Sequence, residues 1–175
     1  MHNYLPKKFY YIDNYDINNI KNITSDIGII FRNYSTKIDR KQIIKIKEFC
    51  KKKGIKLFLG NDIKSALSLS LDGAYIPSFN HNFNHLNFMK RKNFLLIGSA
   101  HNVKELRIKE TQLVSCIFLS SIFKKNKNYL GLYKFRNLMS LTNKKVYALG
   151  GISKGNIKML KNLKVSGFAA ISFFK

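Results

Sequence analysis

The stretch Val146-Tyr-Ala-Leu-Gly-Gly-Ile-Ser-Lys-Gly-Asn156 decides the fold, because it joins an apolar run of strand length to two adjacent glycines. Glycine lets a backbone approach a ligand closely, and a helix N-terminus offers free N–H groups and the positive end of a dipole. Ser153 is placed to cap such a helix, whose apolar face would carry Ile157, Leu160 and Leu163. The stretch therefore predicts a strand, a glycine turn and a helix around a bound phosphate.

A second run of the same kind, Gly167-Phe-Ala-Ala-Ile-Ser172, follows and could close the same pocket with backbone N–H groups and a hydroxyl. Earlier in the chain, short apolar runs alternate with helical segments. The runs begin at Phe9, Ile27, Ile55, Gly73, Phe94, Val114, Val146 and Gly167. Such alternation makes parallel strands joined by helical crossovers. It fits either a (β/α)8 barrel or a doubly wound open sheet, and the periodicity alone does not choose between them.

Composition limits the class of protein. The 175 residues favour a single domain over residues 1–175. Two isolated cysteines, Cys50 and Cys116, fit a reducing cytoplasm, and the absence of an apolar run near 18 residues predicts no membrane span. The net charge of +23 points to anionic partners, but lysines are spread over the whole chain. That spread favours a solvated surface over nucleic-acid binding.

Several motifs together resemble those of the thiamine phosphate synthase and TenI family of (β/α)8 barrels. The likeness covers nearly the whole chain and rests on Arg32, Asn61-Asp62, Asp72-Gly-Ala-Tyr-Ile76, Ser99-Ala-His101, Ser120-Ser-Ile-Phe123, Gly150-Gly151 and Ile171-Ser172. The helices that the family carries before strand one and after strand eight have no counterpart. The resemblance therefore implies a compact barrel that lacks the usual terminal helices.

The resemblance implies a transferase of thiamine biosynthesis that joins a pyrimidine methyl pyrophosphate to a thiazole phosphate and releases pyrophosphate. It assigns the thiazole phosphate to Gly150, Gly151, Ile171 and Ser172, and the pyrophosphate to Arg32, Asn61, Lys125 and Lys127. The catalytic residues it implies are Arg32, Ser99, His101 and Lys127. Asp62 would hold Mg²⁺, or it would instead cap the helix that begins at Ile63.

The chain departs from the family at the end of the site that would bind metal and pyrophosphate. Ile30 and Tyr34 replace the glutamine and lysine that flank the arginine, Asn80 replaces a second magnesium aspartate, and the threonines of the pyrophosphate loop are missing. Of the nine carboxylates, Glu48, Glu105 and Glu110 are predicted to lie in helices, away from the site. Alternative functions are therefore a TenI-like tautomerase that uses His101 as acid and base, a non-catalytic phosphate-binding relative, or a basic nucleic-acid-binding protein.

Two expectations concern geometry. Residues that follow the apolar strands should share one rim of the barrel: Asp13, Arg32, Asp62, Ser99, Ser120, Gly151 and Ser172.

Because strand eight runs into Phe173-Phe174-Lys175 without a helix, the outer faces of strands eight and one should be exposed and aromatic. A large apolar patch usually marks an interface, so this pattern predicts a homodimer.

Overall fold

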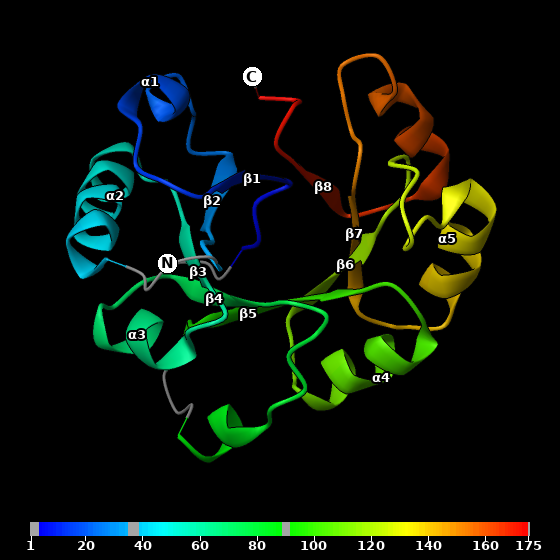
Figure 1. Cartoon of the computed structure of the whole chain (residues 1–175), viewed down its shortest axis with the longest axis horizontal. Coiled ribbons are helices and arrows are strands. Elements are labelled where there is room, and N and C mark those ends of the chain that lie inside the picture. The colour runs from blue at the N-terminus through cyan, green and yellow to red at the C-terminus, as the bar shows by residue number, and fades with distance from the viewer. Residues whose placement is uncertain (1–3, 35–38, 89–91, 175) are drawn as a thin grey trace.

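Eight parallel strands close into a barrel in sequence order, with β8 pairing to β1 (Figure 1). The computed structural model describes residues 4–34, 39–88 and 92–174. The strands are β1 Lys8–Ile12, β2 Ile27–Phe31, β3 Leu57–Gly60, β4 Gly73–Ile76, β5 Leu95–Ala100, β6 Cys116–Ser120, β7 Lys145–Leu149 and β8 Gly167–Ala170. The closed topology confirms the predicted barrel and excludes the open sheet.

Helical segments surround the barrel on its outside (Figure 1). They are α1 Ile17–Ile20, α2 Arg40–Lys53, α3 Ile63–Ser68, η1 Asn84–Asn87, α4 Val103–Thr111, α5 Gly131–Ser140 and η2 Ile157–Leu163, where η marks a 3-10 helix. In α2, Ile43, Ile46 and Cys50 recur at helical spacing and are the buried residues. The helix ends at Gly54, whose φ of 66° lies in the left-handed region that glycine enters without strain.

Aromatic side chains fill the inside of the barrel. The Phe9 ring lies 5.5 Å from that of Phe58, 5.1 Å from that of Phe118 and 5.4 Å from that of Tyr147, measured between ring centroids. All four residues are buried to 2% exposure or less. Short apolar strands thus enclose a packed interior and not a pore, which is typical of this architecture.

The segment after β7 differs from the prediction made for Ser153. The helix η2 begins at Ile157 and has seven residues, so the expected N-terminus at Ser153 is wrong. Asn156 explains the difference, because its Oδ1 accepts from the Ser153 N–H at 2.9 Å and its Nδ2 donates to the Gly151 carbonyl at 2.8 Å. Short asparagine side chains often stabilise turns through such local contacts.

The seam between β8 and β1 is covered and not exposed. Tyr10 is 2% exposed and Phe168 is 8% exposed. The Phe174 ring lies 5.1 Å from Tyr10, and the Phe173 ring lies 4.9 Å from Phe168. The expectation of an exposed aromatic face is therefore wrong, since these two phenylalanines fold back over the seam. A homodimer stays a prediction without this surface to support it.

Within the described residues, none of the helices has the length and apolar character needed to cross a membrane.

Candidate functional site

A cavity of about 450 Å³ opens at the carboxyl ends of the strands. Every strand except β3 contributes to its wall, either directly or through the loop that follows the strand. Cavities of this size hold small ligands, and this end of a barrel is where such sites are built. Most of the predicted site residues line it: Arg32, Ser99, His101, Gly150, Gly151, Ile171 and Ser172. Asn61, Asp62, Lys125 and Lys127 are not among the lining residues.

The two glycines after β7 are required by packing. Gly150 has a φ of 103° and Gly151 a φ of 74°, backbone angles that residues other than glycine rarely adopt. A Cβ atom at Gly151 would lie 2.5 Å from the backbone nitrogen of Lys124. At Gly150 it would lie 2.3 Å from the Ser121 hydroxyl oxygen. The turn after β7 therefore fits against the loop after β6 only when both residues lack side chains.

Free backbone amides gather beside these glycines. The N–H groups of Gly151, Ile152, Ile171 and Ser172 have no hydrogen-bond acceptor within the described part of the chain, and all four residues line the cavity. Neighbouring unpaired N–H groups form concavities that attract anions. Lys124 lines the same cavity and adds a positive charge. We call the four residues that supply these N–H groups the amide cradle; with Lys124 beside it, its chemistry matches a phosphate group.

Aromatic residues and Arg32 line another part of the wall. The Arg32 guanidinium carbon lies 4.2 Å from the centroid of the Tyr11 ring, a cation–π contact. Tyr34 and Phe79 pack edge to face at 5.5 Å and remain 47% and 61% exposed. Burial raises the pKa of Tyr34. This part of the cavity combines planar apolar surfaces with one fixed cation.

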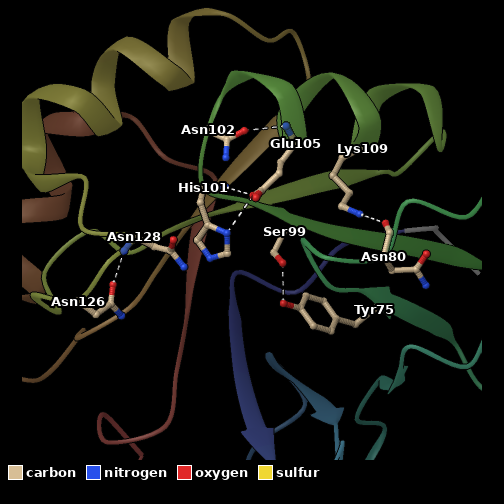
Figure 2. Close-up of polar contacts among 9 residues, drawn as sticks. All are labelled: Tyr75, Asn80, Ser99, His101, Asn102, Glu105, Lys109, Asn126 and Asn128. Atoms are coloured by element: carbon tan, nitrogen blue, oxygen red, sulfur yellow. Dashed lines mark hydrogen bonds and ion pairs between the residues drawn. The ribbon is translucent and has the colours of Figure 1, made fainter.

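Two hydroxyl groups at the floor are available to a ligand. The Tyr75 hydroxyl donates to the Ser99 Oγ at 2.8 Å, so the proton of Ser99 is left for another acceptor (Figure 2). The buried Tyr11 hydroxyl has no partner among the described residues. Its burial raises the pKa of Tyr11 well above the usual 10, so this hydroxyl too remains a donor.

His101 forms a pair with Glu105, a residue that sequence reasoning missed. The His101 Nδ1 atom lies 2.9 Å from Oε2 of Glu105, and the same oxygen accepts from the His101 backbone N–H at 2.7 Å (Figure 2). Asn102 caps α4 by accepting from the Glu105 N–H at 2.9 Å. A carboxylate on one ring nitrogen fixes the orientation of an imidazole and leaves the other nitrogen for a substrate. The signal in the sequence was the spacing of four between His101 and Glu105 at the start of a helix.

Asp62 and its neighbours do not fit a magnesium site. Asp62 Oδ1 accepts from the Ser65 N–H at 2.9 Å, so this carboxylate caps α3 and keeps only Oδ2 for a cation. Asn80 donates from Nδ2 to Asn61 Oδ1 at 2.6 Å and accepts from the Asn82 N–H at 2.9 Å. In the described ranges, no group of three or more His, Cys, Asp or Glu residues could hold a metal ion. Magnesium prefers several oxygen ligands, and the asparagine oxygens here already accept hydrogen bonds.

A comparison with protein-family models identifies the family. Residues 28–174 match the family model described as thiamine monophosphate synthase. Among curated proteins, the chain is 25% identical over 147 residues to a thiamine-phosphate synthase of Fusobacterium nucleatum, a match that covers 81% of this chain and 70% of that protein. It is 35% identical over 83 residues to a thiamine-phosphate synthase of Methanococcus vannielii, a match that covers 45% of this chain and 40% of that protein.

Solved structures give the same picture of the fold. The chain resembles a thiamine phosphate pyrophosphorylase from Pyrococcus furiosus with a TM-score of 0.75 and 17% sequence identity. That match covers 95% of this chain and 86% of the other. At this identity the likeness concerns the fold, and the chemistry depends on the residues around the cavity.

Proposed function

The chain belongs to the thiamine monophosphate synthase family, and from that premise we propose that it joins a pyrimidine methyl pyrophosphate to a thiazole phosphate in a single catalytic domain, residues 1–175. The reaction forms a bond between the thiazole nitrogen and the pyrimidine methylene carbon. The bond from that carbon to the pyrophosphate oxygen breaks, and pyrophosphate leaves with the electron pair. The products are thiamine phosphate and pyrophosphate.

One observation carries this proposal: the amide cradle and Arg32 line one cavity of about 450 Å³. We assign the phosphate of the thiazole to the free amides of Gly151, Ile152, Ile171 and Ser172. Arg32, whose guanidinium is held over Tyr11, would stabilise the charge that develops on the leaving pyrophosphate. The Ser99 hydroxyl and the protonated Tyr11 hydroxyl would donate to acceptors on the substrates.

The loop after β6 supplies a second cation to the site. Lys124 and Asn126 line the cavity, whereas Lys125 and Lys127 do not. We therefore assign to Lys124 the pyrophosphate contact that the family resemblance gave to Lys125 and Lys127. Arg32 and Lys124 would then share the negative charge of the leaving group. Because Asp62 and Asn80 do not fit Mg²⁺, no step of this reaction is assigned to that ion.

A direct assay tests the transferase. The protein is incubated with both phosphorylated substrates, and pyrophosphate release and thiamine phosphate formation are measured together. Each substrate alone is the control, because only a joining reaction requires both. The expected result is equal amounts of the two products. A folded protein that binds thiazole phosphate by calorimetry and forms no thiamine phosphate would contradict the proposal.

A second candidate function is favoured by the pair of His101 and Glu105. An imidazole held by a carboxylate at a phosphate-binding cavity is suited to moving a proton on a single bound thiazole phosphate. This isomerase would need neither a pyrophosphate nor a metal ion. Proton exchange at the thiazole carbon, followed by NMR in heavy water without any pyrimidine substrate, distinguishes it from the transferase.

A further inference from the structure

We propose that Lys109 is a positioning residue: its buried ammonium fixes residues 77–83 as one wall of the cavity and does so without a divalent cation. The inference rests on the proposed function only in that the cavity is the place where the phosphorylated ligand binds.

Lys109 is buried completely on the inner side of α4. Its exposed fraction is 0%, and so is that of Gln112. Gly98 on β5 makes the space for it, because a Cβ atom at that position would lie 2.9 Å from Lys109 Cδ. Burying a lysine costs free energy unless its ammonium finds partners, so the site must repay that cost with hydrogen bonds.

One partner lies on the loop after β4 and the other at the end of α4. Lys109 Nζ donates to the Asn80 carbonyl oxygen at 2.7 Å (Figure 2). It also donates to Oε1 of Gln112, the C-cap residue of α4, at 2.9 Å. Gln112 Nε2 donates to the same Asn80 oxygen at 3.1 Å and to the Asn82 carbonyl oxygen at 2.9 Å. The His85 ring nitrogen Nε2 lies 3.0 Å from the Gln112 carbonyl oxygen. A buried polar network therefore ties the loop to α4 at three successive points.

The tied loop forms part of the cavity. Pro77, Ser78 and Phe79, directly before Asn80, line it, and Phe79 packs against Tyr34 across the opening. The helix that carries Lys109 also carries Glu105, which holds His101. One helix thus sets the place of both the loop wall and the imidazole.

The charges at this corner disfavour a metal ion at Asn80. The side chain of Asn80 is neutral and already bonded to Asn61 and to the Asn82 N–H. The Asn80 carbonyl oxygen accepts a hydrogen bond from the Lys109 ammonium, so a divalent cation at Asn80 would also be repelled by that positive charge. Lys109 therefore supplies, from within the chain, a cation that holds this loop.

Hydrogen exchange on the ligand-free protein tests the proposal. Lys109→Met should speed amide exchange in residues 77–83 roughly tenfold or more, because the Asn80 carbonyl loses a charged donor. Lys104→Met, which removes an exposed lysine from the same helix, should change nothing. Exchange in β1 and β6 reports global stability and should rise much less than exchange in the loop. Unchanged loop exchange in Lys109→Met, or an equal rise everywhere, would overturn the positioning role.

Magnesium supplies the second arm. Exchange of residues 61–82 in the unaltered protein should be the same in excess MgCl₂ and in EDTA, and magnesium should not restore the loop in Lys109→Met. Slower exchange of this region in magnesium would contradict the proposal that the wall is fixed without a metal ion.

Pyrophosphate binding supplies a third arm. The affinity of the protein for inorganic pyrophosphate should fall about tenfold in Lys109→Met. An unchanged affinity beside a loosened loop would also count against the proposal. If the unaltered protein binds no pyrophosphate, the proposed function fails, while the exchange arms still decide the role of Lys109.

Discussion

His101 and Glu105 lie one helical turn apart and meet twice, through the imidazole Nδ1 atom at 2.9 Å and through the backbone N–H at 2.7 Å, both to the same carboxylate oxygen. The contact joins the end of β5 to the first turn of α4, where Asn102 is the N-cap. A side chain at the edge of the cavity is thereby held from a rigid helix and not from a loop.

The first prediction concerns this pair. His101→Asn should lower the rate of proton exchange on bound thiazole phosphate by about 10² to 10⁴ if the imidazole is the acid and base, with the affinity for thiazole phosphate nearly unchanged. Glu105→Gln should lower the rate less, because the ring remains but its orientation is no longer held by a charge. NMR in heavy water measures the rate, and calorimetry measures the affinity. Equal rates in all three proteins would remove His101 from the chemistry.

The second prediction concerns the amide cradle. Gly151→Val should destabilise the protein, because the positive φ at this position would add backbone strain of about 1 to 3 kcal/mol. The clash of the new side chain with Lys124 would add to that cost. A loss of ligand binding in Gly151→Val could therefore reflect either unfolding of the protein or damage to the pocket. Ser172→Ala avoids this problem, since Ser172 is exposed and its hydroxyl lies a long 3.4 Å from the Ile152 carbonyl oxygen.

Ser172→Ala should keep the melting temperature within a degree or two and weaken thiazole phosphate binding roughly fivefold to tenfold, the cost of one hydrogen bond to a charged group. Thermal unfolding and calorimetry on the same samples measure both. An unaltered affinity would show that the hydroxyl of Ser172 does not reach the phosphate.

Most of the fold followed from the sequence because most strands are short apolar runs bounded by glycine, proline or polar residues. Strand β2 occupies Ile27–Phe31 and β4 occupies Gly73–Ile76, both as predicted. In a parallel barrel the carboxyl ends of all strands meet at one rim, so Arg32, Ser99 and Gly151 could be grouped from the sequence alone.

The loops could not be predicted in this way, since they have no period. In the loop after β6, the Lys124 N–H donates to the Gly150 carbonyl oxygen at 3.2 Å, and Ser121 Oγ donates to the Lys124 carbonyl oxygen at 2.9 Å. These two contacts tie Lys124 to the glycine turn, and the pattern of lysines held no sign of them. Glu105 was correctly assigned to a helix, but that helix begins at the site, so its first turn returns the carboxylate to His101.

The third prediction concerns the dependence of stability on pH. Burial lowers the pKa of Lys109 from 10.5 to about 8. Between these values the unfolded chain binds more protons than the folded protein, so the free energy of unfolding should rise with pH across this window. The cost of burying the charge is fully present below about pH 8 and disappears as the pH approaches 10.5. The change in free energy is on the order of 3 kcal/mol.

Denaturant unfolding at a series of pH values measures this effect. Lys109→Met removes the titrating group, so the difference between the unaltered protein and this variant isolates Lys109 from the tyrosines that also titrate in alkali. That difference should change with pH in the stated direction. The matched variant Lys104→Met should follow the unaltered protein at every pH, and parallel curves for all three proteins would show that Lys109 titrates normally.

The fourth prediction separates the lysines of the loop after β6. Lys124 lines the cavity beside the amide cradle, while Lys127 belongs to the same loop and does not line it. Both side chains are exposed, so neither substitution should alter stability by more than about 0.5 kcal/mol. Lys124→Ala should weaken the binding of inorganic pyrophosphate roughly tenfold, because a charged hydrogen bond is lost, whereas Lys127→Ala should leave the affinity within about twofold.

Ionic strength separates a direct contact from the general charge of the protein. The effect of Lys124→Ala should persist at raised ionic strength, since a direct contact is screened less than the general field of a chain with a net charge of +23. Calorimetry at low and high salt measures both variants. Equal losses for the two lysines, vanishing together in salt, would show that the anion responds to the overall charge and that the assignment of Lys124 to the pyrophosphate is wrong.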